Sequence, residues 1–419
     1  VAQVAWSGPQ ILHCPMGALL YLGRDCSDLE KYRDRGDIVM RCAGEWMDRP
    51  ETRAVFNALT HEGHQAFFVG GCVRNSLIGS PVDDIDIATN ATPDEVTRLA
   101  THANIKVIPT GIEHGTLTLV KGNHSFEVTT FRKDMKTNGR HAVVEFTDSL
   151  ASDAQRRDFT INALYATATG DIQDPVNGLI DLENRRVRFI GDPHARIEED
   201  YLRILRFFRF YAWYGNQDDG IDPEGLAAVA SSLDGLVGLS KERVGKEVKK
   251  LLSAPNPTVS VAAMRASGVL SVILPEADDR ALGILNHLEE QVDIAPNPIR
   301  RLACVGGTDV ATRLRLSRAE AREYRMLRNA IEQIWGAAEL GYRLGDAGLS
   351  AYLLRSALLE TPLSDVDLGN LRQGQKAVFP VTALDLPHLQ GADLGRHLKE
   401  LESRWIQSGF TASRKDLLE

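Results

Sequence analysis

Two aspartates separated by one residue, Asp84 and Asp86, are the residues whose spacing most clearly predicts chemistry. Side chains alternate between the two faces of a strand, so both carboxylates would point to one face and Ile85 to the other. Carboxylates held together repel each other, which favours a divalent cation between them. The preceding apolar run ends in Gly70 and Gly71, a turn at which phosphate can approach backbone N–H groups. Metal next to phosphate is the arrangement of phosphoryl or nucleotidyl transfer.

Glu127 is the candidate third carboxylate of this site. Phe126 and Val128 share one face of a predicted strand and leave Glu127 on the other. If this strand lies next to the strand of the aspartates, Glu127 completes a carboxylate cluster. If it does not, Glu127 is a surface residue, and the sequence leaves both interpretations open.

Arg157, Asp158 and Asn162 form a second polar group, in a segment predicted to be helical over 155–166. Residues four apart share a helix face, so Asp158 and Asn162 would lie together. Next to a nucleotide, such a face can hold the triphosphate and the ribose hydroxyls. The same pattern by itself also fits an amphipathic helix with a salt-bridged surface.

Asp200 and Arg203 are three residues apart on a predicted helix and would therefore be neighbours on one face. The carboxylate can accept a hydrogen bond from an exocyclic amino group, while the guanidinium donates to ring nitrogen or carbonyl acceptors. Cytosine and adenine satisfy both groups, whereas uracil and guanine place a carbonyl against the carboxylate. The pair therefore predicts selection of C and A. The alternative is an ordinary surface salt bridge, which stabilises a helix by a few tenths of a kcal/mol.

The whole chain limits the class of protein. Its 419 residues are too many for one compact core, and its net charge of −9 argues against a uniformly basic nucleic-acid coat. No apolar run approaches the roughly 20 residues that span a bilayer, so no membrane segment is expected. The cysteines have no metal-binding spacing and indicate reduced thiols in a cytoplasmic protein; they are Cys14, Cys26, Cys42, Cys72 and Cys304.

The pattern changes along the chain predict four regions. Residues 1–45 are interpreted as an N-terminal extension without a catalytic role, since they lack the charged start and cleavage site of a secretory signal. Residues 46–190 mix helices and strands, with a polar stretch over 133–148 that favours a mobile loop. Residues 191–255 and 256–419 have helical periodicity. The regular elements expected in the mixed region are helices over 49–61, 92–103 and 155–166, and strands over 66–69, 85–88, 106–109, 115–121 and 125–132.

Five segments in order resemble the class II tRNA nucleotidyltransferase and bacterial poly(A) polymerase family, within the polymerase-β-like nucleotidyltransferases. They are GGCVR…DDIDIAT, RRDFTINAL, DPVNGLIDL, EEDYLRILR and SKERVGKEVKKLL. The resemblance is strong over about residues 47–255 and looser beyond. It implies an α+β fold, with a small mixed-sheet nucleotidyltransferase head over 46–190 followed by an all-α neck, body and tail. The neck, over 191–255, would carry the base-reading residues, and the body and tail, over 256–419, would bind tRNA.

The resemblance also implies roles for individual residues. Asp84 and Asp86 would bind Mg²⁺ and would be catalytic together with Glu127 if that residue joins them. The phosphates, the sugar and the base of the nucleotide would be bound by Gly70, Gly71, Arg74, Arg157, Asp158, Asn162, Asp200, Arg203 and Arg206. The loop with Arg140 and His141 would help to switch from CTP to ATP. Asn75 departs from the usual aspartate of the family, and NGRHA from the commoner DGRHP.

The expected activity is addition of C, C and A to the tRNA 3′ end from CTP and ATP, in the cytoplasm. The segments TGIEHGTLTLV and FEVTTFR resemble the CCA-adding branch. The alternatives are poly(A) polymerase, an enzyme that adds only CC or only A, and an inactive RNA-binding homologue. A groove for the tRNA acceptor arm could include Arg243, Lys246, Lys249, Lys250, Arg404, Arg414 and Lys415. The oligomeric state is left open.

Overall fold

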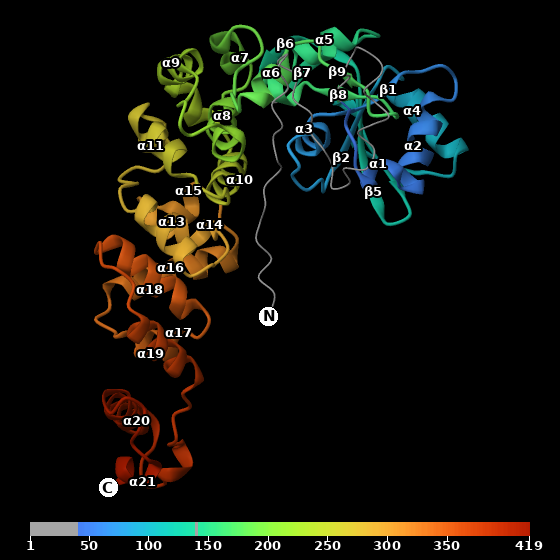
Figure 1. The fold of residues 1–419 in the computed structure, drawn as a ribbon. Coiled ribbons are helices and arrows are strands. Elements are labelled where there is room, and N and C mark those ends of the chain that lie inside the picture. The colour runs from blue at the N-terminus through green and yellow to red at the C-terminus, as the bar shows by residue number, and fades with distance from the viewer. Residues whose placement is uncertain (1–40, 139–140) are drawn as a thin grey trace, which may run out of the picture. The chain divides into compact units, whose positions relative to one another are not determined.

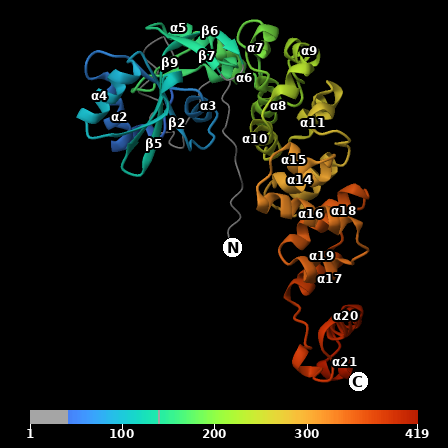
Figure 2. The ribbon, with the colours of Figure 1, turned by 180° about the vertical axis from the view of Figure 1, so that it is seen from behind.

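The computed structural model describes residues 41–138 and 141–419 (Figures 1 and 2). The chain divides into two compact units, of which the first extends to Phe207 and includes Tyr214–Gly235, and the second comprises Phe208–Trp213 and Leu236–Glu419. The predicted extension 1–45 lies outside the described residues except for its last five. In the part of the chain that is described, no helix is long and apolar enough to cross a membrane.

The first unit is built on a mixed sheet of seven strands in the order β3-β4-β5-β2-β1-β8-β9, with a separate two-stranded sheet of β6 and β7. Strands β2 and β5 run parallel, whereas the other neighbours in both sheets are antiparallel. The strands are β1 (Ala66–Val69), β2 (Ile85–Thr89), β3 (Lys106–Gly111), β4 (Thr116–Lys121), β5 (His124–Thr130), β6 (Arg132–Asn138), β7 (His141–Phe146), β8 (Tyr165–Ala166) and β9 (Ile172–Gln173).

Strand β1 lies inside this sheet because both of its faces are apolar. Phe68 packs against Phe56 on one face, with ring centroids 4.4 Å apart. Phe67 contacts Phe131 and Tyr165 on the other face. Strands buried on both sides have few polar positions, which explains why β1 and β2 were correctly predicted from the sequence.

Helices connect and follow these strands in the first unit, and one of them, α8 (Leu202–Tyr214), is shared with the second unit through Phe208–Trp213. Thr92 and Glu95 form the capping box that begins the helix expected over 92–103. The helices are α1 (Glu45–Asp48), α2 (Pro50–Thr60), α3 (Gly71–Leu77), α4 (Pro93–His102), α5 (Leu150–Gln155), α6 (Gly178–Glu183), α7 (Pro193–Glu199), α8 (Leu202–Tyr214) and α9 (Pro223–Ser231), with 3-10 turns η2 (Ile112–His114), η3 (Thr160–Asn162) and η4 (Leu233–Gly238).

Two sequence-based expectations are wrong. The segment 155–166 is not a helix: α5 ends at Gln155, and the 3-10 turn η3 and the short strand β8 follow. The segment 133–148, expected to be a mobile loop, instead contains most of β6 and β7, which pair in a hairpin. The sequence of β6 lacks apolar alternation, but β7 carries it in Ala142, Val144 and Phe146, a signal that the sequence-based expectation did not use. His141 begins β7, and Arg140 lies outside the described residues.

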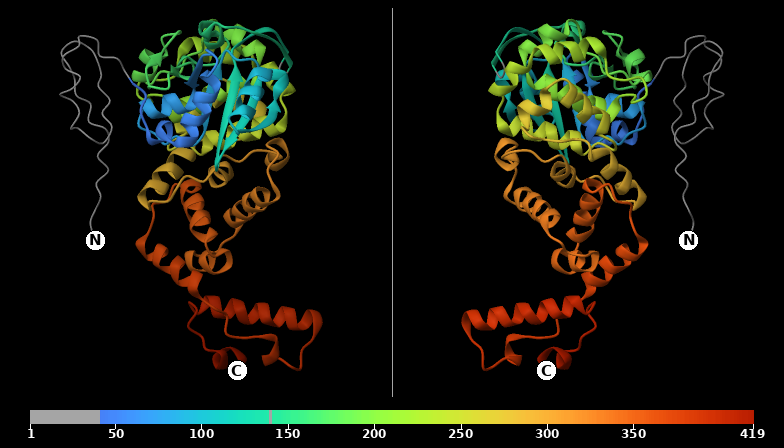
Figure 3. Two further views of the ribbon diagram at one scale, coloured as in Figure 1. Left: turned by 90° about the vertical axis from the view of Figure 1, so that its right-hand side faces the viewer. Right: turned by 90° about the vertical axis from the view of Figure 1, so that its left-hand side faces the viewer.

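The second unit consists of helices and confirms the expected all-α region. A core of apolar side chains around Leu285, Leu340 and Leu353 joins its middle helices. The long helix near the C-terminus is α20, and the short α21 follows it (Figure 3). Its elements are α10 (Lys241–Leu252), α11 (Thr258–Ala266), α12 (Val269–Ile273), α13 (Leu282–Gln291), α14 (Pro298–Val305), α15 (Val310–Arg313), α16 (Arg318–Glu332), α17 (Ala337–Leu344), α18 (Ala347–Leu358), α19 (Asp365–Lys376), η5 (Ala383–Asp385), α20 (Gly391–Gln407) and α21 (Arg414–Leu418). The α+β class is therefore as predicted.

Candidate active site

The carboxylates lie at the start of β2, next to the parallel strand β5. Asp86 is the direct partner of Glu127 in the register of these strands, so both side chains point to the same face. Asp84 is exposed and stands one residue before the strand begins. Burial, the Glu127 carboxylate and the Asp84 carboxylate together raise the pKa of Asp86 to about 6. The strand of Glu127 therefore does lie next to that of Asp86, which was the requirement for Glu127 to join the carboxylate cluster.

This excess of negative charge fits a divalent cation better than it fits a structural ion pair. Among the described residues, however, no three metal-binding side chains converge closely enough to hold an ion alone. Mg²⁺ is usually bound by one or two carboxylates and completes its octahedral shell with water and substrate phosphate. Asp84 and Asp86 fit that mode, in which the nucleotide brings the remaining ligands.

The Gly-Gly turn lies next to Arg157. Gly70 has a φ of 71°, which favours glycine, and a Cβ there would be 3.8 Å from Arg157 Nη1. Asp153, which is fully buried, accepts from Arg157 Nη2 at 3.0 Å and from Tyr165 Oη at 2.7 Å. Burial raises the pKa of Asp153, but the Arg157 and Arg156 guanidinium groups lower it to about 2. The sequence analysis missed Asp153 and Tyr165, although an acid four residues before an arginine on a helix is a recognisable signal.

Four predicted nucleotide-binding residues form one continuous hydrogen-bonded network. Arg74 donates to Asn162 Oδ1, and Asn162 Nδ2 donates to Asp158 Oδ1 at 3.2 Å. Arg206 Nε donates to Asp158 Oδ2 at 2.6 Å. Burial by itself raises the pKa of Asp158, but Arg206 and the hydrogen bond from Asn162 lower it to about 2. The 3-10 turn thus brings Asp158 and Asn162 together, as the expected helix would have done.

Arg74 and Asn75 also hold the neighbouring segments. Arg74 Nη2 donates to Tyr214 Oη at 2.8 Å, and its guanidinium carbon lies 3.9 Å from the centre of that ring. Asn75 Oδ1 accepts from Arg74 Nη2 at 2.9 Å. Asn75 Nδ2 donates to the Pro81 carbonyl at 2.9 Å, shortly before Asp84. An aspartate could accept the first bond but could not donate the second, so this departure from the family pattern has a structural use.

The expected base-reading residues lie at a break between two helices. Helix α7 ends before Asp200, whose backbone is extended and whose Oδ1 accepts from the Leu202 N–H at 3.1 Å. Arg203 forms its ion pair with Glu199, and its Nη1 donates to the Arg196 carbonyl at 2.6 Å. The two residues are close in the chain, but in this structure the carboxylate that binds the Arg203 guanidinium is Glu199. The sequence analysis missed Glu199, although it stands four residues before Arg203.

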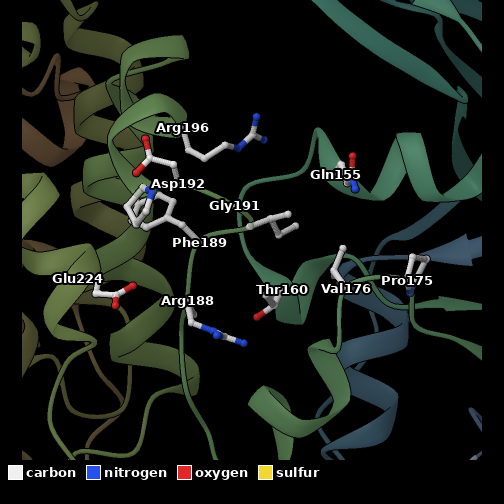
Figure 4. Close-up of a pocket in the computed structure, with 12 residues that line it drawn as sticks. Gln155, Thr160, Pro175, Val176, Arg188, Phe189, Gly191, Asp192, Arg196 and Glu224 are labelled. Carbon is white, nitrogen blue, oxygen red and sulfur yellow. The ribbon is translucent and has the colours of Figure 1, made fainter.

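A cavity of about 720 Å³ lies on another part of the first unit, beside the segment that leads into α7 (Figure 4). Arg196 belongs to its wall and donates to the backbone carbonyls of Arg156 and Arg157. The cavity therefore adjoins the segment that holds the network, but neither aspartate of the carboxylate pair lines it. Its wall consists of Gln155, Thr160, Pro175, Val176, Arg188, Phe189, Ile190, Gly191, Asp192, Pro193, Arg196 and Glu224.

Comparison with known proteins shows which family this chain resembles. A family model described as "Poly A polymerase head domain" matches residues 66–188, and one described as "Probable RNA and SrmB- binding site of polymerase A" matches residues 220–280. The human protein named CCA tRNA nucleotidyltransferase 1, mitochondrial, is 34% identical over 376 residues, which cover 85% of this chain and 86% of the human protein. The CCA-adding enzyme of Levilactobacillus brevis is 38% identical over 219 residues, or 52% of this chain and 53% of that protein.

Solved structures share the fold. The Bacillus stearothermophilus CCA-adding enzyme in complex with CTP has a TM-score of 0.65 at 24% identity, covering 88% of this chain and 95% of that chain. The Thermotoga maritima CCA-adding enzyme complexed with tRNA has a TM-score of 0.65 at 20% identity, covering 91% and 98%.

Proposed function

The chain belongs to the family of CCA tRNA nucleotidyltransferases, and from this membership we propose that it adds C, C and A to the 3′ end of tRNA. CTP and ATP are the nucleotide donors, and pyrophosphate is released. The observation that supports this activity most directly is the carboxylate pair at the start of β2, together with the partly buried Arg157 next to the Gly-Gly turn. An acidic pair alone would repel a triphosphate, whereas an acidic pair with a cation and arginines can hold it.

In the proposed reaction, the RNA 3′-hydroxyl attacks the α-phosphate of the nucleotide. A bound divalent cation, proposed to be Mg²⁺, supplies activation of that hydroxyl and neutralises charge on the triphosphate. Asp84 and Asp86 hold it, with Glu127 as the neighbouring carboxylate. Gly70, Gly71 and Arg157 border the space proposed for the triphosphate, because the turn carries no Cβ and the guanidinium is held rigidly by Asp153.

We assign sugar and phosphate recognition to the network around Asp158. Arg74 and Asn162 are oriented by each other and by Asp158. Arg206 neutralises Asp158, so the network presents donors rather than a net negative charge to the nucleotide.

Base selection is proposed to lie with Asp200 and Arg203. Because Arg203 is engaged by Glu199, reading a base requires its guanidinium to turn or to share its donors. Replacing Arg203 by lysine keeps the charge but removes the planar fork. The ratio of kcat/KM for CTP over UTP should therefore fall for Arg203→Lys, and an unchanged ratio would exclude this residue as a base reader.

The proposed activity is tested by incubating the protein with Mg²⁺, CTP, ATP and a tRNA that lacks CCA. Three added nucleotides, identified by sequencing of the product, are the expected result. The Asp86→Ala variant should add none and still bind the tRNA. Folded wild-type protein that adds no nucleotide would refute the proposal, and Asp86→Ala with normal activity would refute the metal role.

A second candidate is poly(A) polymerase, which is favoured by the description of the model that matches the head. It predicts long A tails on a generic RNA primer with ATP alone. Addition that stops at CC, or that requires a tRNA already ending in CC, would indicate a CC-only or an A-only enzyme.

The proposed compartment is the cytoplasm. The cysteines of the described residues, Cys42, Cys72 and Cys304, are buried free thiols, as suits a reducing environment. The human relative is named as mitochondrial, so cell fractionation of the native protein is the direct test. Recovery in an organelle fraction would overturn this assignment.

A further inference from the structure

Helix α16 carries three arginines on its solvent face, Arg318, Arg322 and Arg325, called here the arginine stripe. Their spacing of four and three residues places them on one side of the helix, and all three are exposed. They border an open surface hollow of about 650 Å³, together with Leu316, Ala319 and Ala321.

The acidic residues of the same helix do not neutralise the stripe. Glu320 binds Lys249 Nζ at 2.6 Å with one oxygen and accepts from the Ser317 N–H with the other. Glu323 accepts from Asn297 Nδ2 at 3.0 Å. Within the described parts of the chain, the stripe arginines form no ion pair with any carboxylate. Three positive charges therefore remain uncompensated on a chain whose net charge is −9.

We propose that the arginine stripe binds the sugar-phosphate backbone of tRNA. The proposal rests on the proposed function, which supplies the RNA, and it adds a surface that lies outside the matched segments 66–188 and 220–280. Guanidinium groups keep their charge at any physiological pH and match the geometry of phosphate oxygens. A row of them along a helix can follow successive phosphates.

The chemistry of the hollow favours RNA over a protein partner. A stable protein contact is usually anchored by buried aromatic or large aliphatic side chains. The lining of this hollow offers Leu316 and two alanines besides the arginines. Two of the basic residues expected from the sequence to bind RNA already have a carboxylate partner, since Lys249 is paired with Glu320 and Arg414 with Asp385.

The test compares two triple variants with the same change in net charge. The stripe variant is Arg318→Gln/Arg322→Gln/Arg325→Gln. The control variant is Arg53→Gln/Arg280→Gln/Arg396→Gln, whose arginines are exposed but paired with Asp48, Asp278 and Asp393. The dissociation constant for tRNA is measured at several salt concentrations. The slope of log K against log salt should fall by about 2 to 3 for the stripe variant, because each lost phosphate contact removes about 0.7 to 0.9.

The control variant should keep the wild-type slope, and the Arg→Lys triple at the stripe should nearly keep it. An equal loss in stripe and control variants, or an unchanged slope in the stripe variant, would overturn the proposal. The single variant Arg322→Gln should lower the slope by about 0.7 to 0.9, which keeps the test decisive if the triple variant does not fold.

Activity separates this inference from the proposed function. For the stripe variant, KM for tRNA should rise at least about tenfold at moderate salt, while kcat and KM for CTP stay unchanged. Wild-type protein that binds tRNA through the stripe but adds no nucleotide would refute the proposed function alone. Active wild-type protein whose tRNA binding does not depend on the stripe would refute the stripe alone.

Discussion

Asp86 and Glu127 are direct neighbours on two parallel strands and carry their carboxylates to the same face of the sheet. The sheet thereby holds two like charges together, with the exposed Asp84 nearby. Burial and these charges raise the pKa of Asp86 to about 6. Repulsion between these carboxylates destabilises the folded state, and a bound cation would offset that repulsion.

The first prediction is that Asp86→Asn stabilises the metal-free protein while it abolishes nucleotide addition. The pKa of Asp86 is raised on folding from 3.8 to about 6, so the ionised form destabilises the folded state above that range. At pH 7.5 in EDTA, urea unfolding should show a gain of up to about 3 kcal/mol over wild type. The gain should shrink as the pH falls below about 6 and vanish only below about pH 3, where the carboxyl group is protonated in both the folded and the unfolded state. Added Mg²⁺ should stabilise wild type and not the variant; equal metal-free stabilities at pH 7.5 would contradict the prediction.

The second prediction concerns Glu127→Gln. Removing this like charge should lower the pKa of Asp86, so the acidic limb of the pH–activity profile should move to lower pH by up to about one unit. The concentration of Mg²⁺ needed for half-maximal activity should rise, because one carboxylate charge is lost. Glu113→Gln, an exposed change of the same charge, is the control. If the pH–activity profile and the Mg²⁺ requirement of the variant were identical to those of wild type, Glu127 would contribute neither to the pKa of Asp86 nor to metal binding.

The third prediction concerns the ion pair between Asp158 and Arg206. Asp158 is 8% exposed. Arg206→Met would remove the cation that neutralises the Asp158 carboxylate and leave it only the hydrogen bonds from Asn162 and from the backbone. We expect a loss of about 3 kcal/mol in the free energy of unfolding at pH 7. The folded pKa of Asp158, about 2, lies below that of the unfolded state. Its stabilisation is therefore complete above pH 4 and lost towards pH 2, so the difference between wild type and variant should narrow over that range.

Two further variants control this measurement. The double variant Asp158→Asn/Arg206→Met should recover part of the loss, because the buried charge is gone. Arg53→Met removes an exposed arginine paired with Asp48 and should cost less than about 1 kcal/mol. An Arg206→Met variant as stable as Arg53→Met would show that the buried pair contributes little.

The elements that the sequence predicted well are those set by local pattern. Strand β2 is set by a short, mostly buried apolar run, and the start of α4 by the Thr92 and Glu95 side chains. The segment after Gln155 depends instead on distant partners. The Arg196 side chain binds the carbonyls of residues 156 and 157, and the Ile190 N–H binds the Asp158 carbonyl at 3.0 Å. These long-range hydrogen bonds override the helical propensity of the segment, and no periodicity reports them.

The candidate site shows the same division. Register between β2 and β5 places Glu127 next to Asp86, but the sequence could give only the face on which Glu127 lies. The sequence likewise could not determine that Arg203 pairs with Glu199, because Glu199 and Asp200 stand four and three residues before it and both spacings suit a helix. The helix break at Asp200, where the backbone is extended, removes that residue from the helical face.

The fourth prediction concerns Asp153, a positioning residue for Arg157. Asp153→Asn would leave the Arg156 and Arg157 guanidinium groups without their shared carboxylate, so we expect a loss of about 3 kcal/mol in stability. Arg157 should lose its fixed orientation, which should raise KM for CTP and ATP more than it lowers kcat. Tyr165→Phe removes one hydroxyl that donates to Asp153 at 2.7 Å and should cost about 1 kcal/mol, with a smaller rise in KM. If Asp153→Asn loses stability while KM stays unchanged, Asp153 supports the fold and does not position Arg157 for the nucleotide.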